Sequence, residues 1–293
     1  MIFDNGKQSL GVGVYISDVQ KKRRRRRFYF VLIFVLVVVY AVFLLTSWTI
    51  LKSPFFHIEK ITVSGNETVS NDEIFSLLWS RIFEGAKPIK ALLGFYNILI
   101  WPKNLSRNDL VFLPTIKNLE IEKNYKDRSL IVKITERKQR GIWCFEAQNY
   151  AEHIETSAED SPRESASCWW FDDEGVIFKR SLVAEGSLIM AVKDYSQKGK
   201  GLNSLVLPQE FMSNLLSIFK VLKASDLSIK EIKLNDIALQ EVEVETYDGP
   251  KLLFSLRFSA SNALPVIQDF YAKAGFRKLQ YLDFRVENRA YYK

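Results

Sequence analysis

The stretch KKRRRRRFYFVLIFVLVVVYAVFLLTSWTIL, residues 21–51, joins seven consecutive cations to 24 uncharged residues. At about 1.5 Å per residue, a helix over residues 28–51 is roughly 36 Å long, which exceeds the ~30 Å hydrocarbon core of a bilayer. Tyr29 and Trp48 stand near its ends, where aromatic rings favour the headgroup level. The apolar run is longer than that of a cleavable signal peptide, and no small-x-small site follows it. We therefore predict a transmembrane helix over residues 28–51.

The basic run predicts the orientation of that helix. Residues 1–27 carry eight cations and two anions, and so hold most of the chain's formal net charge of +7. The positive-inside rule places this tail in the cytoplasm and residues 52–293 outside the cytoplasmic membrane. Basic clusters are also typical of nucleic-acid binding and nuclear targeting. Because the rest of the chain is nearly neutral, we interpret the charge as a topology signal and expect no nucleic-acid partner.

The chain's two cysteines, Cys144 and Cys168, both lie in the external part, where an oxidising environment permits disulfides. Each stands in a short aromatic run typical of a strand, and a polar stretch over residues 146–167 separates them. Two interpretations stay open: a disulfide, or two small buried hydrophobic residues. The pair is therefore a candidate disulfide.

A first external domain is expected over residues 54–138. Ser70 and Glu73 form an S-x-x-E capping box at a helix start, and Val69 and Ile74 can make the hydrophobic staple around it. Alternating apolar residues indicate strands on both sides of this helix. The expected strands cover residues 56–63, 119–121 and 130–134.

A second, strand-rich domain is expected over residues 141–293. Asp172, Asp173 and Glu174 form an acidic cluster between two strands, but they are contiguous and end in Gly175. An EF-hand spaces its ligands through 12 residues, so we interpret the cluster as a hairpin turn and not as a metal site. Apolar periodicity predicts a helix from residue 209 or 210, three strands within residues 232–258, and a short helix near residues 263–274.

Three phrases of the external part, together with the anchor, resemble a known family. The phrases are Phe56–Asn66, Val69–Ile74 and Leu130–Arg137. The order strand, helix, second helix, strand, strand after a membrane anchor resembles a POTRA domain, and the chain over about residues 21–293 is similar to the FtsQ/DivIB family of bacterial cell-division proteins. The resemblance implies an α+β fold: a transmembrane helix, a β-α-α-β-β POTRA domain, and a mostly antiparallel β-rich distal domain with two helices.

The last residues of the chain carry the most family-specific phrase. FtsQ/DivIB proteins close their distal domain with a similar segment, which in that family receives the small coiled-coil division subunits FtsB and FtsL. Apolar and charged residues alternate here, as in a strand with one core face and one charged face. We predict β-augmentation, in which a partner adds a strand to this edge; the alternative is a strand that only completes the sheet. The predicted binding strand consists of Tyr281, Leu282, Asp283, Phe284, Arg285, Val286 and Glu287.

The resemblance implies a non-enzymatic divisome scaffold, a single-pass type II membrane protein that recruits and regulates the septal peptidoglycan synthase complex at the division septum. It implies no catalytic residue, cofactor or metal. A POTRA-containing envelope transport or assembly factor is an alternative, although the distal region is short and charged for the usual large barrels. A membrane-anchored cell-wall hydrolase is a third hypothesis. The chain has two histidines, His57 and His153, and neither stands in a metal-binding or nucleophile motif.

Overall fold

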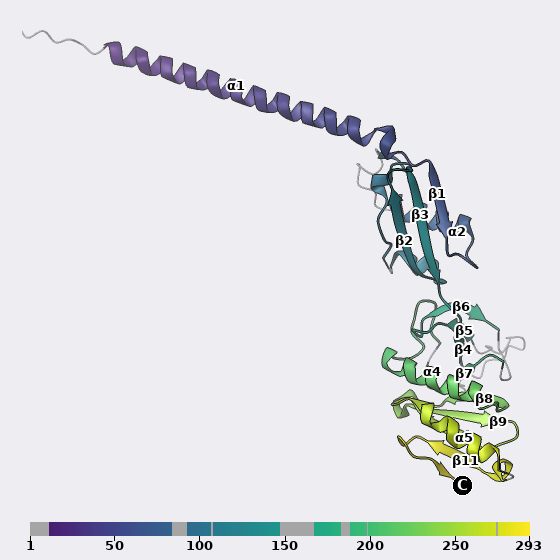
Figure 1. Cartoon of the computed structure of the whole chain (residues 1–293). Coiled ribbons are helices and arrows are strands. Elements are labelled where there is room, and N and C mark those ends of the chain that lie inside the picture. The colour runs from purple at the N-terminus through teal and green to yellow at the C-terminus, as the bar shows by residue number, and fades with distance from the viewer. Residues whose placement is uncertain are drawn as a thin grey trace, which may run out of the picture. The chain divides into compact units, whose positions relative to one another are not determined.

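The structure is a computed structural model of α+β class, with a long apolar helix followed by strands and shorter helices (Figure 1). The sequence places the second helix expected in the first domain no more closely than residues 83–118. Residues 84–92 and 107 of this stretch lie outside the described residues, and the described part holds 3-10 turns at Ile98–Ile100 and Asp109–Phe112. The polar insert between the cysteines also lies outside the described residues. The described residues form two compact units. The first unit contains those within Met1–Ile61, Phe83–Trp101 and Lys123–Leu130, and the second unit contains the others. The domain limits expected at residues 138 and 141 stay a prediction. The structure describes residues 12–83, 93–106, 108–146, 167–182, 188–197, 199–273 and 275–293.

Helix α1 (Val12–Leu51) is continuous over 40 residues. It begins before the predicted span and includes the basic run, because Lys and Arg have a high helix propensity and do not interrupt a helix. The stretch Lys22–Thr49 is long and apolar enough to cross a membrane. The rest of the protein does not bury its most apolar part. The predicted apolar helix is therefore confirmed in length and composition.

The first unit continues from α1 with a short turn. Residues Pro54–Phe56 form the 3-10 helix η1, where sequence analysis expected a strand from residue 56. Ser53 caps the turn by accepting a hydrogen bond from the Phe55 N–H at 3.3 Å, and a proline at the first position is preorganised for it. A second 3-10 turn, η2, covers Ile98–Ile100. The buried hydrophobic residues of this unit are Ile58, Ile98, Ile100, Trp101 and Leu130.

A three-stranded sheet contributes residues to both units and has the order β1-β3-β2. Helix α2 (Asn71–Phe83) follows β1 and begins where the capping box predicts. The Ser70 N–H donates to the Glu73 carboxylate at 3.0 Å, and the Glu73 N–H donates to the Ser70 hydroxyl at 3.3 Å. Val69 and Ile74 are both buried, as the staple requires. The strands are β1 (Lys60–Ser64), β2 (Ile116–Asn124) and β3 (Ser129–Glu136), and the 3-10 helix η3 (Asp109–Phe112) precedes β2.

A nine-stranded sheet makes up the larger part of the second unit, in the order β12-β11-β10-β9-β8-β7-β4-β5-β6. Among the described strands, five neighbouring pairs are antiparallel and three are parallel, so the sheet is mixed but mostly antiparallel. The strands are β4 (Gly141–Phe145), β5 (Ser167–Phe171), β6 (Ile177–Ser181), β7 (Ala191–Asp194), β8 (Ile229–Leu234), β9 (Glu241–Thr246), β10 (Lys251–Ser255), β11 (Tyr281–Phe284) and β12 (Tyr291–Tyr292).

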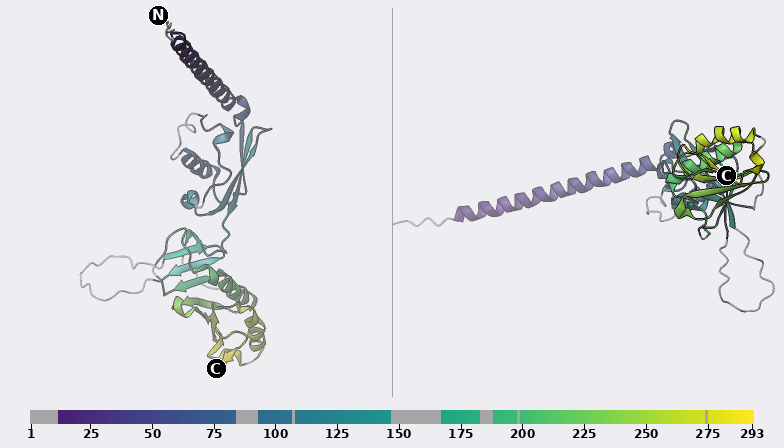
Figure 2. Two further views of the ribbon diagram at one scale, coloured as in Figure 1. Left: turned by 90° about the vertical axis from the view of Figure 1, so that its left-hand side faces the viewer. Right: turned by 90° about the horizontal axis from the view of Figure 1, so that it is seen from below.

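Two of the parallel pairs are joined through helices. Parallel neighbours need a crossover connection, and α4 (Gln209–Ala224) provides it between β7 and β8, as α5 (Ala263–Tyr271) does between β10 and β11. Both helices cover the same face of the sheet, as the turned views show (Figure 2). The core lies between this face and the helices. Sequence analysis predicted α4 and α5 but missed β7, a four-residue strand with a weak apolar pattern.

Cys144 and Cys168 are joined by a disulfide. They lie directly opposite each other in the antiparallel β4–β5 pair, with a Cα–Cα distance of 4.0 Å. Both side chains are buried and pack in a small cluster with Ile142, Trp170 and Ala191, on neighbouring strands. Of the two interpretations left open by the sequence, the structure selects the disulfide.

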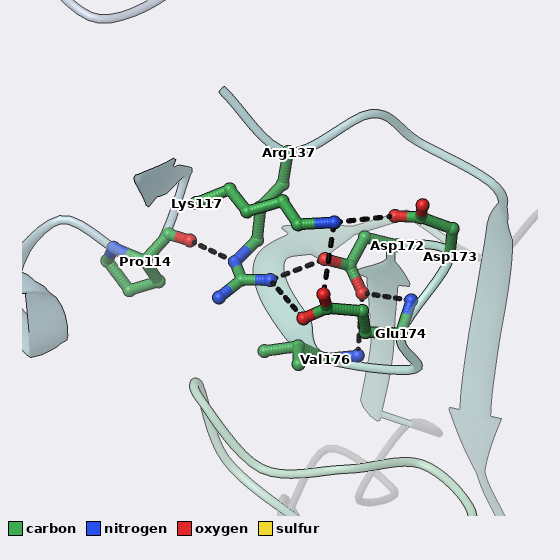
Figure 3. Close-up of polar contacts among 7 residues, drawn as sticks. All are labelled: Pro114, Lys117, Arg137, Asp172, Asp173, Glu174 and Val176. Atoms are coloured by element: carbon green, nitrogen blue, oxygen red, sulfur yellow. Dashed lines mark hydrogen bonds and ion pairs between the residues drawn. The ribbon is translucent and has the colours of Figure 1, made fainter. Parts of the chain in front are cut away.

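The acidic cluster forms the turn between β5 and β6, as predicted (Figure 3). Asp172 is fully buried, and its Oδ1 accepts hydrogen bonds from the N–H groups of Glu174 at 3.0 Å and Val176 at 2.9 Å. Gly175 has a φ of +80°, in the left-handed region that favours glycine. Backbone N–H groups of the turn therefore satisfy the hydrogen-bonding capacity of one oxygen of the buried Asp172 carboxylate.

Arg137, just after β3, binds the other oxygen of Asp172 (Figure 3). The Arg137 side chain is 11% exposed, and its Nε also donates to the Pro114 carbonyl at 3.1 Å. Lys117 of β2 pairs with Glu174 at 3.1 Å and Asp173 at 3.4 Å. Two cations from the β2–β3 region thus balance most of the charge of the acidic turn.

Replacing Arg137 by Met should destabilise the second unit by about 3 kcal/mol, because removal of one partner leaves a buried, uncompensated carboxylate. The free energy of unfolding of the full chain in detergent, from a urea titration followed by tryptophan fluorescence, measures the loss. Lys117→Met is the matched control on the same turn. Its ion pairs are partly exposed and should contribute less than about 1 kcal/mol. Equal losses in the two variants would contradict the prediction.

Opening the disulfide should lower the free energy of unfolding by about 3 kcal/mol, because the closed loop restricts the unfolded chain. The two cysteines are 24 residues apart in sequence. Urea titrations of the oxidised chain, the reduced chain and the Cys144→Ala/Cys168→Ala double variant test this. The reduced chain and the double variant should agree within about 1 kcal/mol; an unchanged midpoint after reduction would contradict the expectation.

Candidate functional site

The predicted binding strand lies near one end of the nine-stranded sheet. Strand β11 contains only its first four residues, Tyr281–Phe284. Leu282 and Phe284 are buried in the core, whereas Tyr281 and Asp283 are half-buried on the other face. The last three predicted residues, 285–287, follow the strand. The alternation of a core face and a polar face is thus found in the first four residues.

The edge of the sheet is one strand further out than expected. Strand β12 pairs with β11 in antiparallel orientation, with Leu282 opposite Tyr292 and Asp283 opposite Tyr291. Among the described strands, β12 is the first in the sheet order. The chain reverses direction between the two strands with Asn288 at φ 57°, a left-handed conformation that Asn tolerates. Two tyrosines after a turn are too short a run for strand periodicity, but the Asn and the aromatic pair are the signal that could have found β12.

Tyr292 presents the free backbone groups of this edge. The Lys293 carbonyl accepts from the Gln280 N–H at 2.6 Å, and the Lys293 N–H donates to the Tyr281 carbonyl at 3.3 Å. Backbone groups of successive residues in a strand point to opposite sides, so the N–H and C=O of Tyr292 point away from β11. The side chains of Tyr291 and Tyr292 are 46% and 62% exposed. A partner strand would meet these backbone groups beside the ring of Tyr291, whereas the ring of Tyr292 packs on Phe270 of α5 with centroids 5.0 Å apart.

Arg285 links the two strands that neighbour β10 in the sheet. Its Nε donates to Asp283 Oδ1 at 2.9 Å, its Nη2 pairs with Asp283 Oδ2 at 2.6 Å, and its Nη1 pairs with Glu241 at 2.8 Å. Glu241 is on β9 and Asp283 is on β11, and both strands neighbour β10. Burial opposes the shift, but the hydrogen bonds from Arg285 lower the pKa of Asp283. Hydrogen bonds to Asp283 and then Glu241 raise the pKa of Arg285.

This geometry changes the role expected of the charged residues. The sequence places Asp283 and Arg285 in the predicted partner-binding strand, but in the structure Arg285 binds both Asp283 and Glu241. Glu241 alternates with valines along β9, a pattern typical of a solvated strand face, and no sequence signal pairs it with a residue 44 positions later. Substitution of Arg285 therefore affects the sheet itself before it affects any partner.

Ion pairs continue across the face of the sheet that the helices leave uncovered. The pairs are Lys193–Glu231 at 2.7 Å, Lys233–Glu231 at 2.9 Å, Lys233–Glu245 at 2.9 Å and Lys251–Glu243 at 2.7 Å. The hydrogen bond to Glu245, opposed by burial, raises the pKa of Lys233. Burial opposes the shift of Glu231, but hydrogen bonds from Lys193 and Lys233 lower its pKa. The charges of this face are thus largely balanced among themselves.

A cavity of about 180 Å³ lies beside the residues that follow β11. Phe284, Val286 and Ala290 line one side, and Ala263 and Val266 of α5 line the other. Small-molecule sites are commonly about 300–1,000 Å³, so this cavity is small for a cofactor and fits a single side chain. Its lining residues include Arg289 and Ala290, which directly precede β12.

Metal and histidine chemistry finds little support in the part of the chain that the structure describes. No group of three His, Cys, Asp or Glu residues there could hold a metal ion. His57 lies just after the 3-10 turn η1, where its ring stacks on Tyr96. His153 lies outside the described residues. The two histidines are therefore not brought together into a site that the structure describes.

Replacing Arg285 by Ala should lower the free energy of unfolding by about 1 kcal/mol at neutral pH, the upper end for partly exposed ion pairs. The lowered pKa of Asp283 means that the bond stabilises the fold above the ordinary value of 3.8 and is lost as the pH falls through the lowered value. The deficit of the variant should therefore shrink on acidification. Urea titrations at neutral and acidic pH measure it.

A double exchange, Asp283→Arg with Arg285→Asp, is the control for this experiment. It keeps the contact between the two residues and loses the contact with Glu241, so it should be more stable than Arg285→Asp alone. A deficit that is independent of pH, or a double variant no better than the single one, would contradict a stabilising role for the contacts of Arg285 with Asp283 and Glu241.

Comparison with known proteins assigns no family to this geometry. No protein-family model matches the chain, and no curated protein matches it. The function of the site therefore rests on its residues and on the resemblance carried by the sequence.

Proposed function

We propose that the chain is a single-pass membrane scaffold of the FtsQ/DivIB type, which binds partner proteins of the division machinery through the free edge of its nine-stranded sheet. The observation that carries the proposal is this edge: a two-residue strand, β12, that exposes the backbone groups of Tyr292 and two tyrosine rings. An exposed edge favours addition of a further strand, unless a protein blocks it.

The organisation of the chain supports the same proposal. An apolar helix of sufficient length precedes a strand, a helix and two strands, the described part of the expected POTRA order. The basic run at residues 21–27 favours a cytoplasmic N-terminus, which leaves both external regions outside the cytoplasmic membrane. A disulfide between Cys144 and Cys168 is in keeping with an oxidising compartment.

The partners follow from the sequence resemblance. We expect the small coiled-coil subunits FtsB and FtsL at the β12 edge, and through them the septal peptidoglycan synthase complex. A segment that adds to β12 gains backbone hydrogen bonds, and one of its side chains can enter the cavity beside Val286. The role is that of a scaffold, in which contacts and not catalysis carry the function.

A fluorescent protein fused to the N-terminus should accumulate at the division plane of dividing cells of the source bacterium, because a divisome scaffold is recruited there. Fluorescence microscopy through the cell cycle measures this distribution. A uniform envelope signal throughout the cycle would contradict the proposal and favour a transport or assembly factor.

The edge itself is tested by Tyr292→Pro, which removes the outward N–H while proline stays compatible with an edge strand. Co-purification of the full chain with co-expressed FtsB and FtsL should fall severalfold. The substitution also removes the contact of the Tyr292 ring with Phe270, so its unfolding midpoint should be compared with that of a variant that loses the same ring. Tyr292→Thr is the matched control, since it removes the ring and keeps the N–H. Loss of binding in both variants would assign the contact to the ring; normal binding by the proline variant would exclude strand addition at β12.

A further inference from the structure

The residues that follow α1 bring aromatic side chains to the surface of the first unit. Phe55 and Tyr96 are 55% and 59% exposed, whereas Trp101 of the same unit is 2% exposed. Trp48, in the C-terminal part of α1, is 40% exposed. Phe55 comes four residues after the end of α1 at Leu51. A large exposed ring costs free energy in water, so its position beside an apolar helix calls for a physical explanation.

Tyr96 is distant in sequence from the residues that follow α1 but contacts His57 and Ile58. The Tyr96 carbonyl accepts from the Ile58 N–H at 2.7 Å, and the Tyr96 ring stacks on His57 with centroids 5.5 Å apart and an interplanar angle of 19°. The rings of Phe55 and Phe56 meet edge to face, with centroids 5.3 Å apart. We name Phe55, His57 and Tyr96 the aromatic patch.

Two cations border the aromatic patch and the end of α1. Lys52 Nζ lies 5.0 Å from the centroid of the Trp48 ring. Arg128 donates to the Pro54 carbonyl at 3.5 Å and pairs with Glu59, whose N–H donates to the Arg128 carbonyl at 2.8 Å. Aromatic rings together with long cationic side chains are typical of the membrane–water interface, where the rings sit at the headgroup level.

We propose that the aromatic patch lies in the headgroup region of the bilayer, so that the first unit binds the lipid surface next to its own anchor. The inference rests on α1 crossing the membrane, as in the proposed function, and is independent of any role in division. Four residues span at most about 14 Å, so Phe55 stays within reach of the headgroup layer when α1 crosses the hydrocarbon core with its apolar run up to Leu51. The backbone bond from Ile58 then places Tyr96 at a similar depth.

The experiment uses the full chain in vesicles of phosphatidylethanolamine and phosphatidylglycerol. Phe55→Cys and Tyr96→Cys variants are labelled with an environment-sensitive maleimide fluorophore; Cys144 and Cys168 are joined and do not react without reductant. Lipids with a spin label at the headgroup quench fluorophores at that depth. Both labels should be quenched severalfold more strongly than a label at Tyr247→Cys, the matched control, which is 59% exposed in the second unit.

A label at Val38→Cys, in the middle of the apolar run, separates this inference from the membrane span. If acyl-chain spin labels quench Val38→Cys while the labels at residues 55 and 96 behave like the control, the aromatic patch is not at the lipid surface and the inference is wrong. If Val38→Cys is not quenched either, α1 does not cross the bilayer, and both the inference and the anchor of the proposed function are overturned.

Discussion

Parallel strand pairing is the constraint on which the larger sheet depends. A parallel pair cannot be closed by a tight turn, so β7 with β8 and β10 with β11 each need a crossover, and each crossover is a helix. Right-handed crossovers that travel in one direction along a sheet place their helices on one face. Helices α4 and α5 accordingly share a core with one face of the sheet. The opposite face receives no helix and must be compatible with water by other means.

Over β7 to β11 the uncovered face meets this requirement with charge. Lysines and glutamates on neighbouring strands alternate in sign, so each cation has a carboxylate within hydrogen-bond distance. Arg285 extends the pattern to the last strands by joining β9 with β11 over β10. The same arrangement leaves the edge strand β12 as the place where backbone groups, and not charges, stay available. In a sheet of this kind, the backbone groups of the edge strand are the groups left to bind a partner.

Local signals in the sequence predicted much of the fold. The capping box at Ser70, the paired aromatic runs around the cysteines, and the apolar face of α4 each depend on residues within a few positions, and each is found. The order of the nine strands depends on pairings between distant residues, which periodicity does not encode. Asp194 illustrates this limit. Its carboxylate is fully buried and accepts hydrogen bonds from Trp143, Ser196 and Gln197, and no sequence motif predicts those contacts.

The candidate site shows the same division between local and distant contacts. Alternation in residues 281–284 predicted the core face of β11, whereas the position of the edge required β12, a strand of two residues. The partner of Arg285 could not be predicted, because Glu241 looks like any exposed glutamate on a strand. The exposure of Tyr96 also needed the structure, since its neighbour Phe95 has the same chemistry but packs against Trp101.

The disulfide has a further consequence for how the chain responds to proteases. Cys144 and Cys168 lie on adjacent strands, and their bond closes a covalent loop in the chain. A peptide bond cut anywhere between the two cysteines would produce two fragments that remain covalently joined. Such a nicked protein would migrate as one band on a gel without reductant and as two bands with it.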